Sequence, residues 1–363
     1  MRPGLLTALL SSLVLVMAGC SATDDPPTDP DPRAASPESP ATTSAPEPEP
    51  ESEASEPPQQ KPAPAVSVPG LAEQRHRGDR LRLGAVRERT AAYTSYDVTY
   101  RSRSTAGPRQ DRAESYRISG VLNVPTGRGP FPAVVLAHGY IDPAFYVRGQ
   151  GMTRERGYLA SRGYIALHVD YRNHAESDDD PNYQNRLRLG YSADVINAVK
   201  ALRASRDVPV DDDRVALFGR SMGGGVILKA LVAEPGLVQA AAPWASVSSL
   251  EAQNYRQFMA DDPDDDAIRD QLIRRHGTPA QNPRFWRQNS SRPYFERITE
   301  PVLMVHGRFD DTCPPRWAPA TQRALVSAGV DSHLVWYDDG HAFGPAFNAA
   351  MNRTIRFFDN RLG

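Results

Sequence analysis

The chain has 363 residues, 24% of them charged and 40% hydrophobic, and its formal net charge at pH 7 is −2. This near-neutral charge argues against a nucleic-acid-binding protein that is attracted to its target by bulk charge. With only two cysteines, the chain cannot form a disulfide-rich scaffold or a zinc site of four cysteines, and we expect neither a metal nor a cofactor.

The first twenty residues have the pattern of an export signal. An apolar run from Leu5 to Ala18 follows a single positive charge. This run is shorter than the roughly 20 apolar residues that span a bilayer, and it fits the apolar region of a secretory signal peptide. Its end, residues 16–20 (VMAGC), resembles a bacterial lipobox. That resemblance implies a lipoprotein signal peptide over residues 1–19 and a lipid on Cys20, which would anchor the protein to the outer face of the bacterial cell membrane. The alternative is an ordinary cleaved signal with a chance cysteine.

Residues 20–70 are predicted to form a disordered tether. Of the chain's 33 prolines, 13 lie between Pro26 and Pro64, and residues 21–61 carry a net charge of −8 without any aromatic side chain. Such a segment buries too little apolar surface to offset the entropy of ordering it. The sequence therefore predicts one folded domain over residues 71–363.

Strand-like and helix-like segments alternate within this domain. The predicted strands are 96–100, 116–124, 133–137, 164–169, 215–218, 237–243, 301–305 and 332–337. One predicted helix ends near residue 161, and the others cover 191–205, 222–233, 319–328 and 351–360. The first two strands are typical of an antiparallel start. The alternation that follows predicts an α/β fold with a mainly parallel central sheet and helices on both faces.

Residues 250–296 interrupt this alternation. They contain an acidic run at 261–266 and a short predicted helix around 268–275. The segment lies between two predicted strands and is too small for a second domain, so we expect a small helical cap insert. Its large aromatic residues either line a modest apolar pocket or pack the insert onto the sheet; they are Tyr255, Phe258, Phe285 and Trp286.

A Gly-x-Ser-x-Gly motif at 219–223 follows a predicted strand and opens a predicted helix. In this context the two glycines allow strand and helix to approach closely, and the serine is exposed in a tight turn. We therefore predict Ser221 as a nucleophile and the backbone N–H of Met222, at the start of the helix, as an oxyanion donor. The alternative is a phosphate-binding glycine loop, but the glycines at 223–225 do not match that pattern.

A second oxyanion donor is predicted after the strand at 133–137. There the run His138-Gly139-Tyr140 allows the chain to bend, and the backbone N–H of Tyr140 can point to the same oxygen as that of Met222. We expect His138 to be structural, because it precedes the bend.

The predicted base and its partner follow the last two strands. Asp310 and Asp311 come after the strand at 301–305, and His341 comes after the strand at 332–337. The order Ser, Asp, His is the one expected after a Gly-x-Ser-x-Gly turn, and the carboxyl ends of strands are where open α/β sheets place their sites. We predict that His341 takes the proton of Ser221 and that one of the two aspartates orients it.

Four stretches of the sequence point to one family. They are residues 170–174 (DYRNH), 212–224 (DDRVALFGRSMGG), 301–314 (PVLMVHGRFDDTCP) and 340–343 (GHAF). From about residue 93 onward the chain resembles the α/β-hydrolase superfamily, and within it the catalytic domain of the prolyl oligopeptidase family and dienelactone-hydrolase-like esterases. The resemblance implies the α/β-hydrolase fold. The register of the H-G-x-x-D-x-x-V-P pattern, with cysteine and proline at 313 and 314, selects Asp310 over Asp311.

The resemblance also bears on the substrate. Peptidases of the prolyl oligopeptidase family carry a large β-propeller before the catalytic domain, and we expect no room for one here. We therefore predict a serine hydrolase that forms an acyl-enzyme, a carboxylesterase acting on small to medium esters. The alternatives are a serine peptidase of prolyl oligopeptidase type acting on short peptides, acyl transfer to a bound alcohol and, in another class, a non-catalytic envelope-binding lipoprotein. The expected partners are the ester or peptide substrate and, through Cys20, the membrane, with no nucleic acid.

Overall fold

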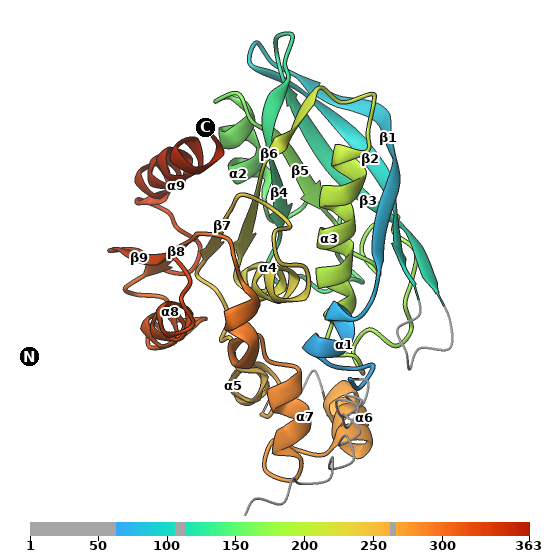
Figure 1. Ribbon diagram of the computed structural model, residues 1–363, viewed down its shortest axis with the longest axis vertical. Helices are drawn as coiled ribbons and strands as arrows, with labels where there is room; N and C mark the ends of the chain where they lie inside the picture. Colours follow the sequence, from blue (N-terminus) through green and yellow to red (C-terminus); the bar gives the residue numbers. More distant parts are fainter. Residues whose placement is uncertain (1–62, 106–112, 262–265) are drawn as a thin grey trace, which may run out of the picture. The chain divides into compact units, whose positions relative to one another are not determined.

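A computed structural model describes residues 63–105, 113–261 and 266–363 (Figure 1). The expected signal peptide, Cys20 and most of the expected tether lie outside the described residues. Within the described residues, no helix has both the length and the apolar character that crossing a bilayer requires.

In the described part of the chain, nine strands form one sheet with the order β1-β2-β3-β5-β4-β6-β7-β8-β9 (Figure 1). The strands are β1 (His76–Arg89), β2 (Tyr93–Ser104), β3 (Glu114–Pro125), β4 (Phe131–Ala137), β5 (Ile165–Val169), β6 (Val210–Arg220), β7 (Ala240–Trp244), β8 (Val302–Gly307) and β9 (Ser332–Tyr337). The pairs β1–β2, β2–β3 and β3–β5 are antiparallel. The remaining pairs, from β5–β4 across the sheet to β8–β9, are parallel. This confirms the predicted α/β-hydrolase fold.

Helices cover both faces of the sheet. They are α1 (Val68–Ala72), α2 (Thr153–Ala160), α3 (Leu189–Arg203), α4 (Met222–Ala233), α5 (Glu251–Phe258), α6 (Asp266–His276), α7 (Pro283–Gln288), the 3-10 helix η2 (Arg292–Arg297), α8 (Trp317–Ser327) and α9 (Phe347–Leu362). Ala133 and Val135 of β4 join the core under α3 and α4, whereas Val134 and Leu136 join the core under α2 and α9. Because successive side chains of a strand point to opposite faces, the continuous apolar run in β4 serves both cores.

The long strand β1 is absent from the predicted strands. Its sequence, HRGDRLRLGAVRER, is rich in arginine, and most of its second half is exposed. It pairs only with β2, at the edge of the sheet. An edge strand with one exposed face needs little apolar alternation, so the pattern that identifies buried strands is missing here.

The predicted end of the tether at residue 70 is wrong, because residues 63–72 belong to the folded domain. Ser67 caps α1 by accepting a hydrogen bond from the N–H of Gly70 at 2.9 Å. Val68 and Leu71 are buried in the main core, where α1 contacts α3 and α4. Two apolar side chains are enough here, because the short helix α1 presents both to the same core.

The insert between β7 and β8 folds into α5, α6, α7 and η2, in the lower part of Figure 1. The rings of Tyr255 and Trp286 lie 4.9 Å apart, and Phe285 stacks on His276 at 4.0 Å. Trp286 is buried. These contacts favour the packing interpretation of the aromatic residues over a pocket lining.

Candidate active site

Ser221 lies in the turn between β6 and α4, at the carboxyl end of a central strand. Its backbone has φ 58° and ψ −121°, a left-handed φ that few residues other than glycine adopt and that suits the strained turn of a nucleophile elbow. A Cβ on Gly219 would lie 2.3 Å from the carbonyl oxygen of Gly223, and one on Gly223 would lie 1.9 Å from that of Ala137. Only glycine therefore fits at either end of the motif.

The predicted oxyanion donors flank this turn. Met222 is the first residue of α4, so its N–H belongs to the first turn of a helix, where backbone donors lack an intrahelical partner. Gly139, which precedes Tyr140, packs against the serine: a Cβ at 139 would lie 3.2 Å from Cβ and 3.7 Å from Oγ of Ser221. The loops after β4 and β6 thus meet at Ser221, and donation by the two N–H groups stays a prediction.

His138 is buried behind this loop. Its ring lies 4.7 Å from that of Tyr146 and 4.4 Å from that of Tyr171. Its Nδ1 and Nε2 lie 2.6 and 3.3 Å from the carbonyl oxygens of Gly139 and Asp170. Burial lowers the pKa of His138 to about 3. The ring is therefore neutral at neutral pH, and its contacts agree with the structural role expected for it.

The predicted base and its carboxylate partner meet across two neighbouring strands. Asp310 follows β8, His341 follows β9, and Nδ1 of His341 lies 2.9 and 3.0 Å from the two carboxylate oxygens. The Asp310 side chain is fully buried, whereas 21% of the His341 side chain is exposed. This contact favours the tautomer with a proton on Nδ1 and leaves Nε2 able to accept one. Asp311 is exposed, so the geometry agrees with the choice of Asp310.

The carboxylate of Asp310 has further partners. The backbone N–H groups of Thr312 and Cys313 donate to it at 3.0 and 2.8 Å, and Nε2 of His306 lies 3.4 Å away. Burial by itself favours the neutral acid, but the hydrogen bonds from His341 and Cys313 outweigh it and hold the pKa of Asp310 below its usual range. Asp310 is therefore charged at neutral pH, as an orienting carboxylate must be.

Cys313 contacts both this carboxylate and Ser221. Its N–H donates to Asp310, and its thiol lies close to the side chain of Ser221. Burial raises the pKa of the Cys313 thiol to about 12, so it stays protonated and is no nucleophile. The sequence predicts a small buried residue here, as found. The contact with Ser221 has no sequence signal, because the two residues are distant along the chain.

Two side chains that the sequence analysis did not single out fix the loop that carries His341. The carboxylate of Asp339 accepts hydrogen bonds from three backbone N–H groups of that loop at 2.7, 2.8 and 3.1 Å. Arg154 of α2 donates to two loop carbonyl oxygens at 2.8 and 2.9 Å. The sequence carries a signal for the hydrogen bonds of Asp339, because an aspartate two positions before a predicted catalytic histidine can accept from nearby backbone N–H groups. The hydrogen bonds of Arg154 depend on tertiary structure alone.

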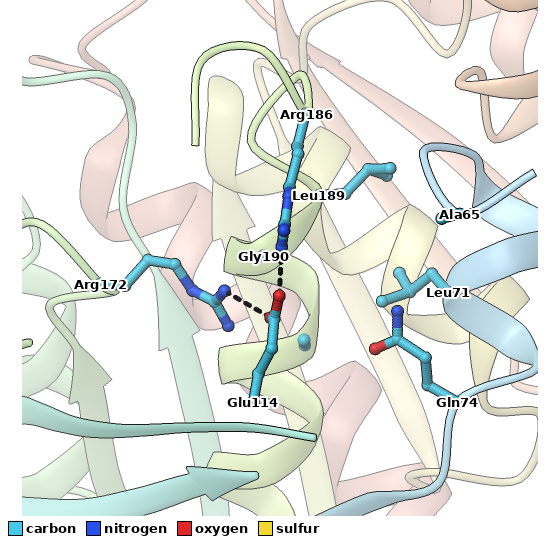
Figure 2. Close-up of a pocket in the computed structure, with 9 residues that line it drawn as sticks. Ala65, Leu71, Gln74, Glu114, Arg172, Arg186, Leu189 and Gly190 are labelled. Carbon is cyan, nitrogen blue, oxygen red and sulfur yellow. Dashed lines mark hydrogen bonds and ion pairs between the residues drawn. The ribbon is translucent and has the colours of Figure 1, made fainter. Parts of the chain in front are cut away.

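A small pocket lies at α1 and the start of α3 (Figure 2). It is lined by Ala65, Leu71, Gln74, Glu114, Arg172, Arg186, Leu189, Gly190 and Ala193. In Figure 2 both arginines reach the carboxylate of Glu114, so each of the two cations on its wall is already paired with a carboxylate. The predicted catalytic residues do not line it. Within the described ranges, no group of three or more metal-ligating side chains could hold a metal ion.

Comparison with known protein families decides the assignment of the chain. Residues 151–363 match the model of the prolyl oligopeptidase family. The chain belongs to the prolyl oligopeptidase family. It is thus a member of a family of serine hydrolases, and the matched segment includes Ser221, Asp310 and His341.

Individual relatives include both peptidases and an esterase. Dipeptidyl peptidase 4 of Felis catus is 29% identical over 195 residues, which cover 52% of this chain but only 24% of that protein. The uncharacterized peptidase YtmA of Bacillus subtilis is 22% identical over 66% of this chain and 87% of its own length. The solved acetyl xylan esterase from Paenibacillus sp. R4 has a TM-score of 0.58 and 22% identity, covering 81% of this chain and 92% of that one. This structural likeness supports the fold alone.

Proposed function

We propose that this member of the prolyl oligopeptidase family is a carboxylesterase that hydrolyses small to medium acyl esters through an acyl-enzyme at Ser221. The observation that carries the proposal is the 2.9 Å contact between His341 and Asp310, joined to the Ser221 turn through Cys313. The residues proposed as nucleophile, base and orienting group follow β6, β9 and β8, whose carboxyl ends lie at one edge of the sheet.

The reaction follows from this arrangement. Nε2 of His341 takes the proton of the Ser221 hydroxyl as its oxygen attacks the ester carbonyl, and Asp310 stabilises the imidazolium that forms. The N–H groups of Tyr140 and Met222 donate to the oxyanion of the tetrahedral intermediate. His341 then protonates the leaving alcohol. In the deacylation step it deprotonates the water that attacks the acyl-enzyme and releases the acid.

Exposed apolar side chains in the segments that follow β4 and β8 support an ester with an acyl chain as substrate. Tyr140, Phe145 and Val147 follow β4, and Phe309 follows β8, with 48%, 79%, 64% and 69% of their surfaces exposed. Because β4 and β8 run in the same direction and end at the same edge of the sheet, we infer that these exposed apolar groups form a binding surface there. The insert's aromatic residues, in contrast, contact one another, which leaves less of the insert to order a long peptide. An amide demands such order, because its leaving nitrogen must be protonated in place.

A serine peptidase is the second candidate. It is favoured by the match to dipeptidyl peptidase 4, although the aligned segment is about a quarter of that protein. Both candidates use the same nucleophile and base, so the leaving group is what separates them.

The test is a comparison of kcat/KM for p-nitrophenyl acetate and butyrate with that for alanine and proline p-nitroanilides. The esters are expected to be the better substrates, and Ser221→Ala should abolish their turnover while Ser161→Ala, at an exposed serine on the surface, should not. Equal or better turnover of the anilides would reject the esterase and favour the peptidase. A folded protein that cleaves neither would favour a non-catalytic binding role.

We also propose that a lipid on Cys20 holds the enzyme at the outer face of the cell membrane. The support is the apolar run that ends in Ala18-Gly19-Cys20, followed by a long acidic, proline-rich segment. Cys20→Ala should release the protein from the membrane fraction or block its processing. A mature chain that starts well after Cys20 and partitions into the aqueous phase of detergent would contradict the anchor.

A further inference from the structure

Arg188 places a guanidinium group beside both residues that we propose as oxyanion donors. Its Cζ lies 4.7 Å from the centre of the Tyr140 ring, and its Nη1 lies 4.0 Å from Sδ of Met222. Arg188 belongs to the connection from β5 to α3, and β5 lies on the side of β4 that faces away from β8 and β9. In the order of the strands, Arg188 and His341 therefore lie on opposite sides of β6, the strand that ends just before Ser221.

The charge of Arg188 has no carboxylate partner in the described parts of the chain. Its Nε donates to the neutral Oε1 of Gln184 at 3.1 Å, and its remaining contacts are the tyrosine ring and the methionine sulfur. Arg186, two residues earlier, shows the contrast: it pairs with Glu114 (Figure 2) and with Asp180. A half-buried cation without a counter-charge is costly, and a bound anion would remove that cost.

The backbone at this point is also unusual. Leu187 and Arg188 have φ values of 47° and 56°, two successive left-handed residues that are not glycine. The N–H of Arg188 donates to the carbonyl oxygen of Tyr183 at 2.9 Å and closes the turn. Backbone strain of this kind persists where the surrounding structure enforces it, and it gathers at functional sites. Here it aims the arginine at Tyr140 and Met222.

The flank on which Arg188 lies identifies the part of the substrate that it meets. His341 must protonate the leaving group, so the leaving group lies on the side of β8 and β9. The portion that extends toward β5 is then the acyl group. Arg188 contacts the end of the Met222 side chain, so about the length of one methionine side chain separates its guanidinium from the Met222 backbone N–H. The carbon chain of a short dicarboxylic acid can span this distance.

We propose that Arg188 binds a carboxylate at the far end of the acyl group, so that the preferred substrates are monoesters of short dicarboxylic acids. This inference rests on the proposed function, because it requires an ester that is cleaved at Ser221. A guanidinium can bind a carboxylate through two parallel hydrogen bonds. Such a charged contact is expected to raise kcat/KM roughly 10- to 100-fold over a neutral acyl chain of equal length.

The test uses matched pairs of esters that differ in one terminal group. The mono-p-nitrophenyl esters of succinate, glutarate and adipate are compared with p-nitrophenyl butyrate, valerate and hexanoate, with rates in the absence of enzyme subtracted. The readout is the ratio of kcat/KM for the acidic ester to that for its neutral partner. We expect a ratio of roughly 10 to 100 for at least one chain length, and we expect it to fall as salt is raised, because salt screens the ion pair.

Three variants test whether Arg188 causes the preference for the acidic ester over its neutral partner. Arg188→Gln should lower it by roughly 10- to 100-fold, and Arg188→Lys should retain part of it. Arg162→Gln is the matched control, since Arg162 also lies over a tyrosine ring, at 3.5 Å from that of Tyr158, but is exposed on the surface; it should leave the ratio unchanged. A purely structural role for Arg188 predicts an equal loss for both esters and an unchanged ratio, and that result would overturn the inference.

The outcomes separate this inference from the proposed function. If Ser221→Ala keeps full esterase activity, the assignment of the nucleophile fails and the inference fails with it. If the wild-type enzyme cleaves the neutral esters through Ser221 but shows no preference for the acidic ones, only the role of Arg188 is wrong.

Discussion

Replacing Asp310 by asparagine tests the orientation of the base. The substitution keeps the size of the side chain and an oxygen for the N–H groups of Thr312 and Cys313, which lie 3.0 and 2.8 Å from Oδ1. It removes the charge and turns an amide NH2 toward Nδ1 of His341. That amide favours the tautomer with the proton on Nε2, which cannot accept the proton of Ser221.

The expected cost of Asp310→Asn is a loss of roughly 10⁴ in kcat, the magnitude seen when a catalytic triad loses control of its tautomer. This corresponds to about 5.5 kcal/mol of lost transition-state stabilisation. The assay is kcat for p-nitrophenyl butyrate at neutral pH, with thermal unfolding measured beside it to show that the fold is retained. Asp311→Asn is the matched control, because Asp311 is exposed, and its kcat should stay near that of the wild type. A larger loss in the Asp311 variant would refute the reasoning.

Two further predictions concern stability. A chain that begins at Leu71 should be roughly 2–4 kcal/mol less stable to urea than one that begins at Ala63, because it loses the buried Val68 and the Ser67 cap; equal stability would show that α1 contributes nothing. The free energy of unfolding should also fall as the pH drops below about 6.5, the pKa of an unperturbed histidine. Burial lowers the pKa of His76, His138, His168, His174 and His306. The unfolded chain therefore binds protons in this range that the folded chain does not, and each histidine adds a slope of at most about 1.4 kcal/mol per pH unit. Equal urea midpoints at pH 7.5 and 5.5 would contradict this.

Local pattern predicted most of the fold. The buried strands of the parallel part are continuous apolar runs, and the helix at 222–233 coincides with α4. The sequence pattern does not mark β1, because an edge strand with an exposed face carries no such run. The local sequence also does not show that the folded domain begins before residue 70, because the burial of Val68 depends on α3 and α4.

The candidate site likewise contains residues that the sequence predicts and contacts that it does not. Ser221, Asp310 and His341 could be predicted because each follows a recognisable strand within a short motif. The contacts of Cys313 with Ser221, of Arg154 with the His341 loop and of Arg188 with Tyr140 join segments that are far apart in the sequence. No periodicity or motif marks such contacts, because they arise only when the sheet brings the loops together.

The most direct test of the central claim is active-site labelling with a fluorophosphonate probe, with the modified residue identified by mass spectrometry. The account predicts a single adduct on Ser221, which is lost in Ser221→Ala and abolished in His341→Ala, because the serine is activated only by that base. Labelling of a different serine, or full esterase activity in Ser221→Ala, would contradict it.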